Sequence, residues 1–324
     1  MRFSVIIVNH NGGQYLAGAL ASLARQTVRD FEVFVVDNAS TDGSMDALGD
    51  ELPETLHLRP QTINLGFATA NNLAAQEASG NWLVLLNPDA EAAPDWLEKM
   101  AEGIARHPGT AMFASAQINM SDSARMDGAG DAYLGFGIPW RGGFGRPVSE
   151  MPEEGTCFAP CGAGAMYNRE VFLAHGGFDE KLFCFCEDVD IGYRLRLSGE
   201  QCVFLPEAII THEGGGISGR VSEFALFHGA RNRLWVYLKN TPLMLLILTL
   251  PGHIALTAAT LLRGLVTKRA RDTWRGIWFG LKHAGPVLAE RKALKHRKAS
   301  TISLMRAMSW NPLTMLQRKT DVRS

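Results

Sequence analysis

The chain contains 324 residues, of which 46% are hydrophobic and 20% are charged. This length can bury a substantial core in one large or two modest domains, and the composition excludes a disordered or collagen-like chain. The 32 basic and 33 acidic side chains nearly cancel, so the average charge argues against a dedicated binder of polyanions.

Short apolar runs alternate with helical periodicity along the first hundred residues. Strands are predicted at 3–8, 32–36, 56–59 and 82–86, and helices at 15–23, 68–78 and from Pro94 onward. Ser40, Thr41 and Asp42 are candidate N-caps of a further short helix. Alternating strands and helices with short loops indicate a mainly parallel sheet flanked by helices.

Polar side chains follow three of these predicted strands. Asn9 comes after the first strand, Asp37 ends the second, and Asn87 and Asp89 follow the fourth. Asn and Asp also form turns and caps. Their recurrence at three strand ends nevertheless favours a ligand site, because ligands bind beyond the carboxyl ends of parallel strands.

Residues 122–160 are rich in glycine and only weakly periodic, and we expect extended hairpins and loops there. A strand is predicted at 163–167, a helix at 188–197, and two further strands at 201–205 and 208–211. The five cysteines are expected to be free thiols in a reducing cytoplasm, because no secretory signal pattern opens the sequence.

Several segments, in one order, resemble the motifs of family 2 glycosyltransferases: SVIIVNHNG, VVDNASTDGS, NLGFATANN, LLNPDA, GAGAMYNREVFLAHGGFDEKLFCFCEDVDIGYRLRLSG and THEGGGIS. The likeness covers roughly residues 3–240 and is greatest to the bacterial rhamnosyltransferase branch. It implies a GT-A fold, which is a Rossmann-like α/β fold with a mixed, mainly parallel sheet. We therefore expect a glycosyltransferase domain at 1–238, with a nucleotide-sugar half at about 1–118 and an acceptor half at about 119–238.

The resemblance implies that the donor is held by Asn9, Asp37, Gly66, Asn71, Asn72 and Asn87. Asp37 would accept hydrogen bonds from the base or ribose, with Asn9 bordering the base, and Gly66 would let the backbone approach the nucleotide closely. The family often carries Arg-Asn where this chain has Asn71 and Asn72, so a cation that contacts phosphate is expected to be missing there.

A metal site is implied at Asn87-Pro88-Asp89, where many relatives carry Asp-x-Asp. Asp89 would bind Mg²⁺ or Mn²⁺, which bridges the two phosphates and stabilises the leaving group. His212 stands where the family can supply a second ligand, although a histidine before glycines also fits a loop. Asn87 in place of the first Asp weakens the expectation of tight metal binding.

Catalysis is implied at Glu187-Asp188-Val189-Asp190. Acidic residues also suit the start of a helix, but the family's general base is the aspartate of this Glu-Asp pair. Asp188 would deprotonate the acceptor hydroxyl, which attacks the anomeric carbon opposite the diphosphate and inverts its configuration. Glu187 or Asp190 would orient the acceptor or the base, and Arg194, one turn beyond Asp190, would pair with it.

The last third of the chain differs in charge and hydropathy. Residues 1–238 carry 16 basic and 30 acidic side chains, whereas 239–324 carry 16 basic and 3 acidic ones. Residues 240–262 contain no charged side chain, a length that can span a bilayer. Because Pro251 interrupts this stretch, two short helices lying on one leaflet are favoured over a true span or a packing face in a soluble protein.

An amphipathic helix is predicted next, with Trp274, Ile277, Trp278 and Leu281 on one stripe, followed by a basic cluster at 291–298. The stripe could also face a core. With the basic cluster, it favours an anionic membrane surface as the partner of a helical tail at 239–324. No nucleic-acid-binding fold accompanies these charges, so nucleic acid is not expected as a partner.

Taken together, the sequence predicts an inverting, metal-dependent glycosyltransferase on the cytoplasmic side of the cell membrane, peripheral or monotopic. We expect it to transfer rhamnose from dTDP-rhamnose to a glycan or lipid-linked acceptor in surface polysaccharide synthesis. A UDP-sugar donor and a non-catalytic sugar-binding scaffold stay open as alternatives. This sequence lacks the glycine-rich signature loop of a sugar-nucleotide pyrophosphorylase. It also lacks the G-x-G-x-x-G motif that follows the first strand of an NAD-dependent dehydrogenase.

Overall fold

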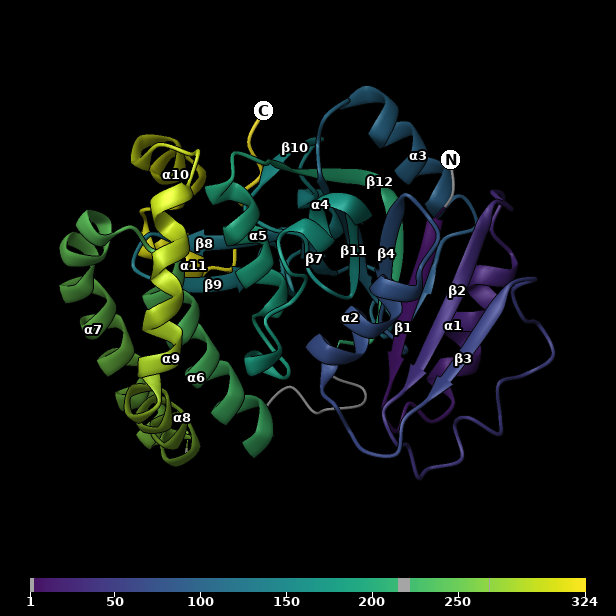
Figure 1. Cartoon of the computed structure of the whole chain (residues 1–324), viewed down its shortest axis with the longest axis horizontal. Coiled ribbons are helices and arrows are strands. Elements are labelled where there is room, and N and C mark those ends of the chain that lie inside the picture. Colours follow the sequence, from purple (N-terminus) through teal and green to yellow (C-terminus); the bar gives the residue numbers. More distant parts are fainter. Residues whose placement is uncertain (1–2, 215–221, 268) are drawn as a thin grey trace.

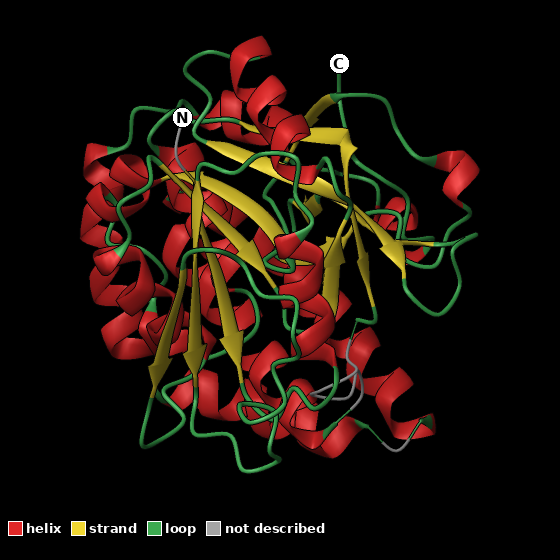
Figure 2. Cartoon of the chain, turned by 90° about the vertical axis from the view of Figure 1, so that its right-hand side faces the viewer, coloured by secondary structure: helices red, strands yellow, loops and turns green. Residues whose placement is uncertain are grey.

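A ten-stranded β-sheet runs through the chain in the computed structural model, which describes residues 3–214, 222–267 and 269–324. Its parallel part contains β1 (Phe3–Asn9), β2 (Phe31–Asp37), β3 (Leu56–Pro60) and β4 (Trp82–Leu86). The four strands lie at the predicted positions. The strands fan out in Figure 2 with the twist that is usual for such sheets.

The second half of the sheet mixes strand directions. β11 (Gly164–Asn168) runs antiparallel between β4 and β6 (Met112–Asn119), and β12 (Cys202–His212) lies parallel to β6. The shorter strands β5 (Ala90–Ala92), β7 (Met126–Ala129) and β10 (Gly155–Cys157) pair with β12, β6 and β12. β8 (Asp131–Leu134) and β9 (Ile138–Arg141) form a separate hairpin.

Helices cover both faces of this sheet. Alternate residues of β1 explain why: Val5 and Ile7 pack in one core with α1 (Tyr15–Ala24) and α3 (Trp96–Arg106). Ile6 and Val8 pack in another core with α2 (Phe67–Glu77), α4 (Arg169–Ala174) and α5 (Glu187–Leu197). A strand buried on both faces requires an unbroken apolar run, which is why the sequence identified it.

Two predicted elements differ in the structure. No helix lies between β2 and β3, because Ser40 and Asp42 accept hydrogen bonds from the backbone N–H groups of Asn11 and Gly13 instead of capping a helix. The strands predicted at 201–205 and 208–211 are one strand, β12, with a change of register between Leu205 and Ile209.

The remaining helices gather at the end of the molecule opposite to β3 (Figure 1). They are α6 (Glu223–Asn240), α7 (Leu243–Val266), α8 (Ala270–Lys282), α9 (Ala284–Ala289), α10 (Thr301–Ala307) and α11 (Pro312–Leu316). Elsewhere along the chain and between these helices lie three short 3₁₀ segments, η1 (Val148–Glu150), η2 (Glu180–Leu182) and η3 (Glu290–His296). The boundary expected after residue 238 falls inside α6, whose Trp235 indole donates a hydrogen bond to the Gly280 carbonyl of α8.

The prediction of two short helices around Pro251 is wrong, because α7 is continuous through this residue. The middle of α7 is held by contacts with its neighbours that offset the lost backbone hydrogen bond. The Tyr237 ring stacks on His253 at 4.2 Å, and the His253 ring bonds to the Phe136 carbonyl at 2.8 Å. By length and composition α7 can cross a membrane, and 17% of its most apolar window is buried.

The stripe predicted on α8 is divided between two environments. Ile277 is buried against α6, whereas Trp274 and Trp278 are 52% and 59% exposed. The end of the chain then packs against residues 119–238, where Arg323 and Thr156 exchange backbone hydrogen bonds and the Trp140 indole donates to the Lys319 carbonyl.

Candidate active site

A cavity of about 910 Å³ opens where β1, β2, β4 and β12 end. Four of the predicted site residues line it: Gly66, Asn87, Asp89 and His212. Loops from both halves of the sheet contribute to the wall, and the tail contributes Arg269 and Arg318. Its place beyond the carboxyl ends of parallel strands agrees with the expectation from the sequence.

Asp89 and His212 form a pair that fits a divalent cation. They are 4% and 2% exposed, and Asp89 Oδ1 lies 3.3 Å from His212 Nε2. Adjacent ligand atoms of an octahedral cation at about 2.1 Å lie roughly 3 Å apart, so the separation suits a shared metal. Asn87 Nδ2 also lies 3.3 Å from His212 Nε2, which puts this amide beside the same point.

A third residue of this cluster, Asp127, was not identified from the sequence. It is fully buried in β7, and its Oδ2 lies 2.7 Å from His212 Nδ1. The same oxygen accepts a hydrogen bond from Arg141 of β9. Burial tends to lower the pKa of His212, but the carboxylates of Asp127 and Asp89 outweigh this effect and raise it. Asp127 lies in the glycine-rich stretch without a readable motif, so only the fold brings it to His212.

Asn9 and Asp37 are buried beside the cavity but do not line it. Asn9 Nδ2 donates to Asp37 Oδ1 at 2.9 Å, and the Ser40 hydroxyl donates to the same oxygen at 2.5 Å. Their neighbours His10 and Asn38 reach the cavity surface instead. The pair therefore stabilises the ends of β1 and β2 in this structure.

Gly66 lines the cavity, and its place in the fold also requires glycine. Its φ is +83°, and an added Cβ would lie 2.7 Å from the carbonyl oxygen of Phe183. The Ala68 N–H donates to this same Phe183 carbonyl. Glycine thus permits the loop before α5 to pack against the start of α2, where Gly66 forms part of the cavity wall.

The structure does not bring Asn71 and Asn72 to this cavity. Asn71 donates to the Phe67 carbonyl within α2, whereas Asn72 exchanges two 2.9 Å hydrogen bonds with the backbone of Phe178. Asn72 lines a second cavity, of about 1000 Å³, between α5 and η3. The prediction that these two residues bind the donor finds no geometric support. Arg141, Arg269 and Arg318 supply cations at the first cavity.

Asp188 is the second residue of α5, which follows a loop in which Phe183, Phe185 and Cys186 have positive φ. Its Oδ2 accepts a hydrogen bond from the Gly162 N–H at 2.9 Å and its Oδ1 from the Val189 N–H at 2.8 Å. Burial raises its pKa, and the two N–H groups oppose this effect. Asp188 is partly buried, and a carboxylate with a raised pKa is a stronger base than one in water.

Other acidic groups surround Asp188. A carboxylate oxygen of Asp188, one of Asp131 and the sulfur of Cys161 all lie within 4.8 Å of one another. Burial, and then the charge of Asp188, raise the pKa of Glu187 well above its usual value. Glu187 Oε2 has no hydrogen-bond partner within the described residues.

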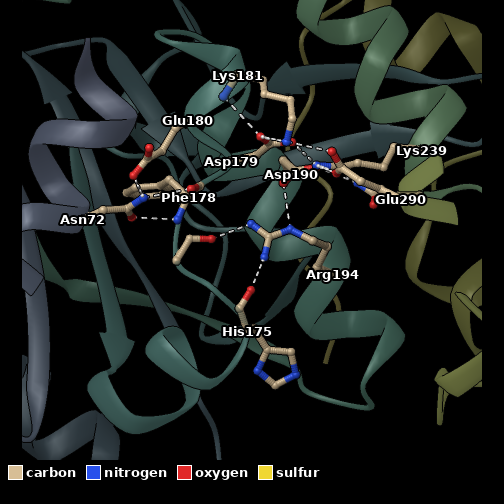
Figure 3. Close-up of polar contacts among 12 residues, drawn as sticks. Asn72, His175, Phe178, Asp179, Glu180, Lys181, Asp190, Arg194, Lys239 and Glu290 are labelled. Carbon is tan, nitrogen blue, oxygen red and sulfur yellow. Dashed lines mark hydrogen bonds and ion pairs between the residues drawn. The ribbon is translucent and has the colours of Figure 1, made fainter. Parts of the chain in front are cut away.

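Asp190 lies elsewhere, in the buried ion cluster that Figure 3 shows. Its carboxylate binds Arg194 Nε at 2.7 Å, Lys239 Nζ at 2.8 Å and Asn240 Nδ2 at 2.8 Å. The predicted pairing with Arg194 is confirmed, but neither residue lines the first cavity. Arg194 also donates to the carbonyls of His175 and Gly177. The cluster joins α5 to α6, so an orienting role for Asp190 at the acceptor has no support from the geometry.

The motif THEGGGIS extends beyond the described residues after Gly214, so its last four positions have no structural account. The five cysteines are free, as expected, although Cys157 and Cys202 face each other on paired strands with their sulfurs 3.4 Å apart.

Comparison with known proteins agrees with this geometry. The family model described as glycosyl transferase family 2 matches residues 4–176. The chain is 30% identical over 249 residues to N-acetylglucosaminyl-diphospho-decaprenol L-rhamnosyltransferase of Mycobacterium tuberculosis, covering 69% of this chain and 80% of the relative. Over 65% of the chain, and 17% of the relative, it is 28% identical to the O-antigen biosynthesis protein RfbC of Myxococcus xanthus.

Solved structures share the fold at lower identity. The S. aureus protein TarS, residues 1–349, superposes with a TM-score of 0.59 at 18% identity, covering 95% of this chain and 88% of that one. A Pyrobaculum calidifontis mannosyltransferase, solved with GDP-Man and Mn²⁺, gives 0.56 at 18% identity, with 94% and 82% covered. The matched motifs, the mixed sheet and these likenesses lead to one conclusion: the chain belongs to glycosyl transferase family 2, is a glycosyltransferase with a GT-A fold, and lies close to the rhamnosyltransferase branch.

Proposed function

We propose that this enzyme is an inverting, metal-dependent rhamnosyltransferase that uses dTDP-rhamnose and acts on a lipid-linked glycan in bacterial surface polysaccharide synthesis. The observation that carries the proposal is the Asp89–His212 pair in a cavity whose wall includes the loop that leads into Asp188. The mycobacterial relative, whose name gives an L-rhamnosyl transfer onto a diphospho-decaprenol acceptor, supports the sugar and the acceptor class.

Asp89 and His212 are the proposed ligands of Mn²⁺ or Mg²⁺. When bound, such a cation neutralises charge that develops on the diphosphate leaving group. The imidazole of His212 favours Mn²⁺, because Mg²⁺ prefers oxygen ligands. Arg141, which lines the same cavity, is the proposed phosphate partner that the Asn71 position does not provide.

Asp188 is the proposed general base. Its two backbone hydrogen bonds fix the carboxylate at the start of α5, and burial strengthens it as a base. The acceptor hydroxyl gives its proton to Asp188 as its oxygen bonds to the anomeric carbon, and the nucleotide diphosphate leaves from the opposite face. This single displacement inverts the anomeric configuration and needs no covalent intermediate. Glu187, adjacent and buried, is proposed to orient the acceptor.

Aromatic side chains support an acceptor that carries both sugar and lipid. Phe183, Phe185 and Phe224 line the cavity, and their rings contact one another at 5.9–6.1 Å in two pairs that share Phe224. Flat apolar surfaces of this kind pack against sugar rings and isoprenoid chains. The arginine at the junction of α7 and α8, Arg269, lies in the same wall and would attract an acceptor diphosphate.

The tail at 239–324 is the proposed membrane-associating region, attached to the catalytic domain at 1–238. Leu245, Thr249 and His253 of α7 pack on the protein, whereas Met244 and Leu248 are each 71% exposed. Because one side of α7 is covered by protein, we favour a helix that lies in one leaflet over one surrounded by lipid. With the basic excess of the tail, this points to peripheral or monotopic attachment on the anionic cytoplasmic leaflet.

The experiment that tests the function is a product-release screen of the full chain with dTDP-rhamnose, UDP-GlcNAc and other UDP-sugars, using a short-chain lipid-diphosphate GlcNAc acceptor. We expect release of dTDP only with dTDP-rhamnose, dependent on Mn²⁺ or Mg²⁺ and abolished by EDTA. Release of UDP would establish the UDP-sugar alternative. Full turnover in EDTA would contradict the metal site, and no donor turnover under any condition would favour a sugar-binding scaffold.

A further inference from the structure

Asp127 joins two functional residues through a single oxygen. Its Oδ2 lies 2.7 Å from His212 Nδ1 and also accepts a hydrogen bond from Arg141. The side chain of Asp127 has no exposed surface, and that of His212 is 2% exposed. β7, β9 and β12 supply the three residues, so tertiary structure alone assembles the chain of contacts.

This contact decides which nitrogen of His212 carries the proton and which one presents a lone pair to the cavity. Both ring nitrogens face a carboxylate, which can only accept a hydrogen bond, but Nδ1 lies 2.7 Å from Asp127 and Nε2 lies 3.3 Å from Asp89. The single proton of a neutral ring therefore belongs on Nδ1, where it makes the shorter hydrogen bond. In the neutral ring Nε2 then keeps its lone pair, and it is Nε2 that lies 3.3 Å from Asp89 Oδ1. A histidine that binds a metal usually has its other nitrogen held by a carboxylate or a carbonyl in this way.

Arg141 in turn fixes the position of Asp127. It lies directly opposite Asp131 in the β8–β9 hairpin and lines the cavity. Asp131 is therefore a second buried carboxylate beside the same guanidinium, but no contact joins it to His212 within the described residues. The two aspartates offer a matched comparison, because either substitution replaces a buried carboxyl group near Arg141.

We propose that Asp127 is a positioning residue that holds His212 in the Nδ1–H tautomer, with Nε2 aimed at the cation beside Asp89. The metal-binding part of this inference rests on the proposed function, whereas the tautomer does not. Removal of such an outer partner typically weakens metal affinity by about 10- to 100-fold.

The first test is Mn²⁺ binding by the purified full chain, measured by the EPR signal of free Mn²⁺. Asp127→Ala is expected to weaken binding by about 10- to 100-fold, and Asp127→Asn, which keeps an acceptor oxygen, by less. Asp131→Asn should bind like the native protein. In a His212→Ala background, Asp127→Asn should cause no further loss, because there is no ring left to orient. Equal Mn²⁺ affinity in the native protein and both Asp127 variants would overturn the inference. It would also be overturned if Asp127→Asn weakened binding as much in the His212→Ala background as in the native protein.

The second test needs no metal. Long-range ¹H–¹⁵N correlation spectra, recorded at alkaline pH where the ring is neutral, report the tautomer of His212, assigned by its disappearance in His212→Ala. We expect Nδ1–H in the native protein and loss of this preference in Asp127→Ala. An Nε2–H tautomer in the native protein would overturn the inference. If the native protein shows Nδ1–H but binds no Mn²⁺, the metal dependence of the proposed function fails while the positioning of His212 stands.

Discussion

Replacement of Asp190 by Asn tests whether the ion cluster in Figure 3 serves stability or catalysis. Burial opposes ionisation of this carboxylate, but Lys239 and Arg194 lower its pKa from 3.8 to about 2. At roughly 1.4 kcal/mol per unit, this shift corresponds to about 2.5 kcal/mol of stability. Because the pKa in the folded state lies below that of the unfolded chain, the contribution is present above pH 3.8 and is lost as the pH falls towards 2.

The substitution also removes the carboxylate that pairs with Arg194 and weakens the ion pairing of Lys239, which keeps its contacts with Asp179 and Glu290. We therefore expect Asp190→Asn to lower the free energy of unfolding by about 3 kcal/mol at pH 7. Urea unfolding followed by circular dichroism measures the difference. Glu51→Gln, which removes the exposed ion pair with Arg25, is the control and should cost less than about 0.5 kcal/mol. A change as small in Asp190→Asn would refute the reasoning. Loss of turnover without loss of stability would restore the orienting role that was predicted for Asp190 from the sequence.

Three further predictions address the site and the membrane. Asp188→Asn should reduce kcat by about 100-fold or more while dTDP binding measured by calorimetry stays unchanged, and near-normal turnover would exclude it as the base. Arg318→Gln should weaken dTDP binding about tenfold if its guanidinium contacts phosphate, whereas equal affinity would place the nucleotide elsewhere in the cavity. The double substitution Trp274→Ser and Trp278→Ser should reduce sedimentation with phosphatidylglycerol vesicles several-fold, with exposed Leu52→Ser as the control. Equal sedimentation of all three proteins would exclude α8 from the membrane contact.

Strands whose side chains are buried on both faces could be predicted from the sequence. β1 and β4 are buried along their whole length and are mostly apolar for that reason. The motif residues Asp89 and His212 lie at the strand ends where the family resemblance placed them. The break predicted in α7 was wrong because the rule for proline counts only the backbone hydrogen bond that proline removes. In the structure, the packing of Tyr237 on the middle of the helix offsets this loss.

Side-chain pairings between distant segments could not be predicted. Asn72 stands in a motif that suggests donor binding, yet its amide is occupied by the backbone of Phe178, more than a hundred positions away. Asp127 lies in a segment with no periodicity or motif, and its importance arises only when β7 is placed beside β12. The motifs located the cavity, whereas the residues that orient its ligands required the fold.

The contact between the carboxyl-terminal segment and residues 119–238 has a consequence for protein engineering. The tail places Arg269 and Arg318 in the wall of the same cavity as Asp89, and the Arg318 guanidinium lies over the Phe144 ring at 4.6 Å. A chimera that received the tail of a relative, in order to redirect the proposed membrane association, would also receive a different wall for the cavity that holds Asp89. The proposed membrane association and the proposed donor site are therefore joined in this architecture and cannot be exchanged as separate modules.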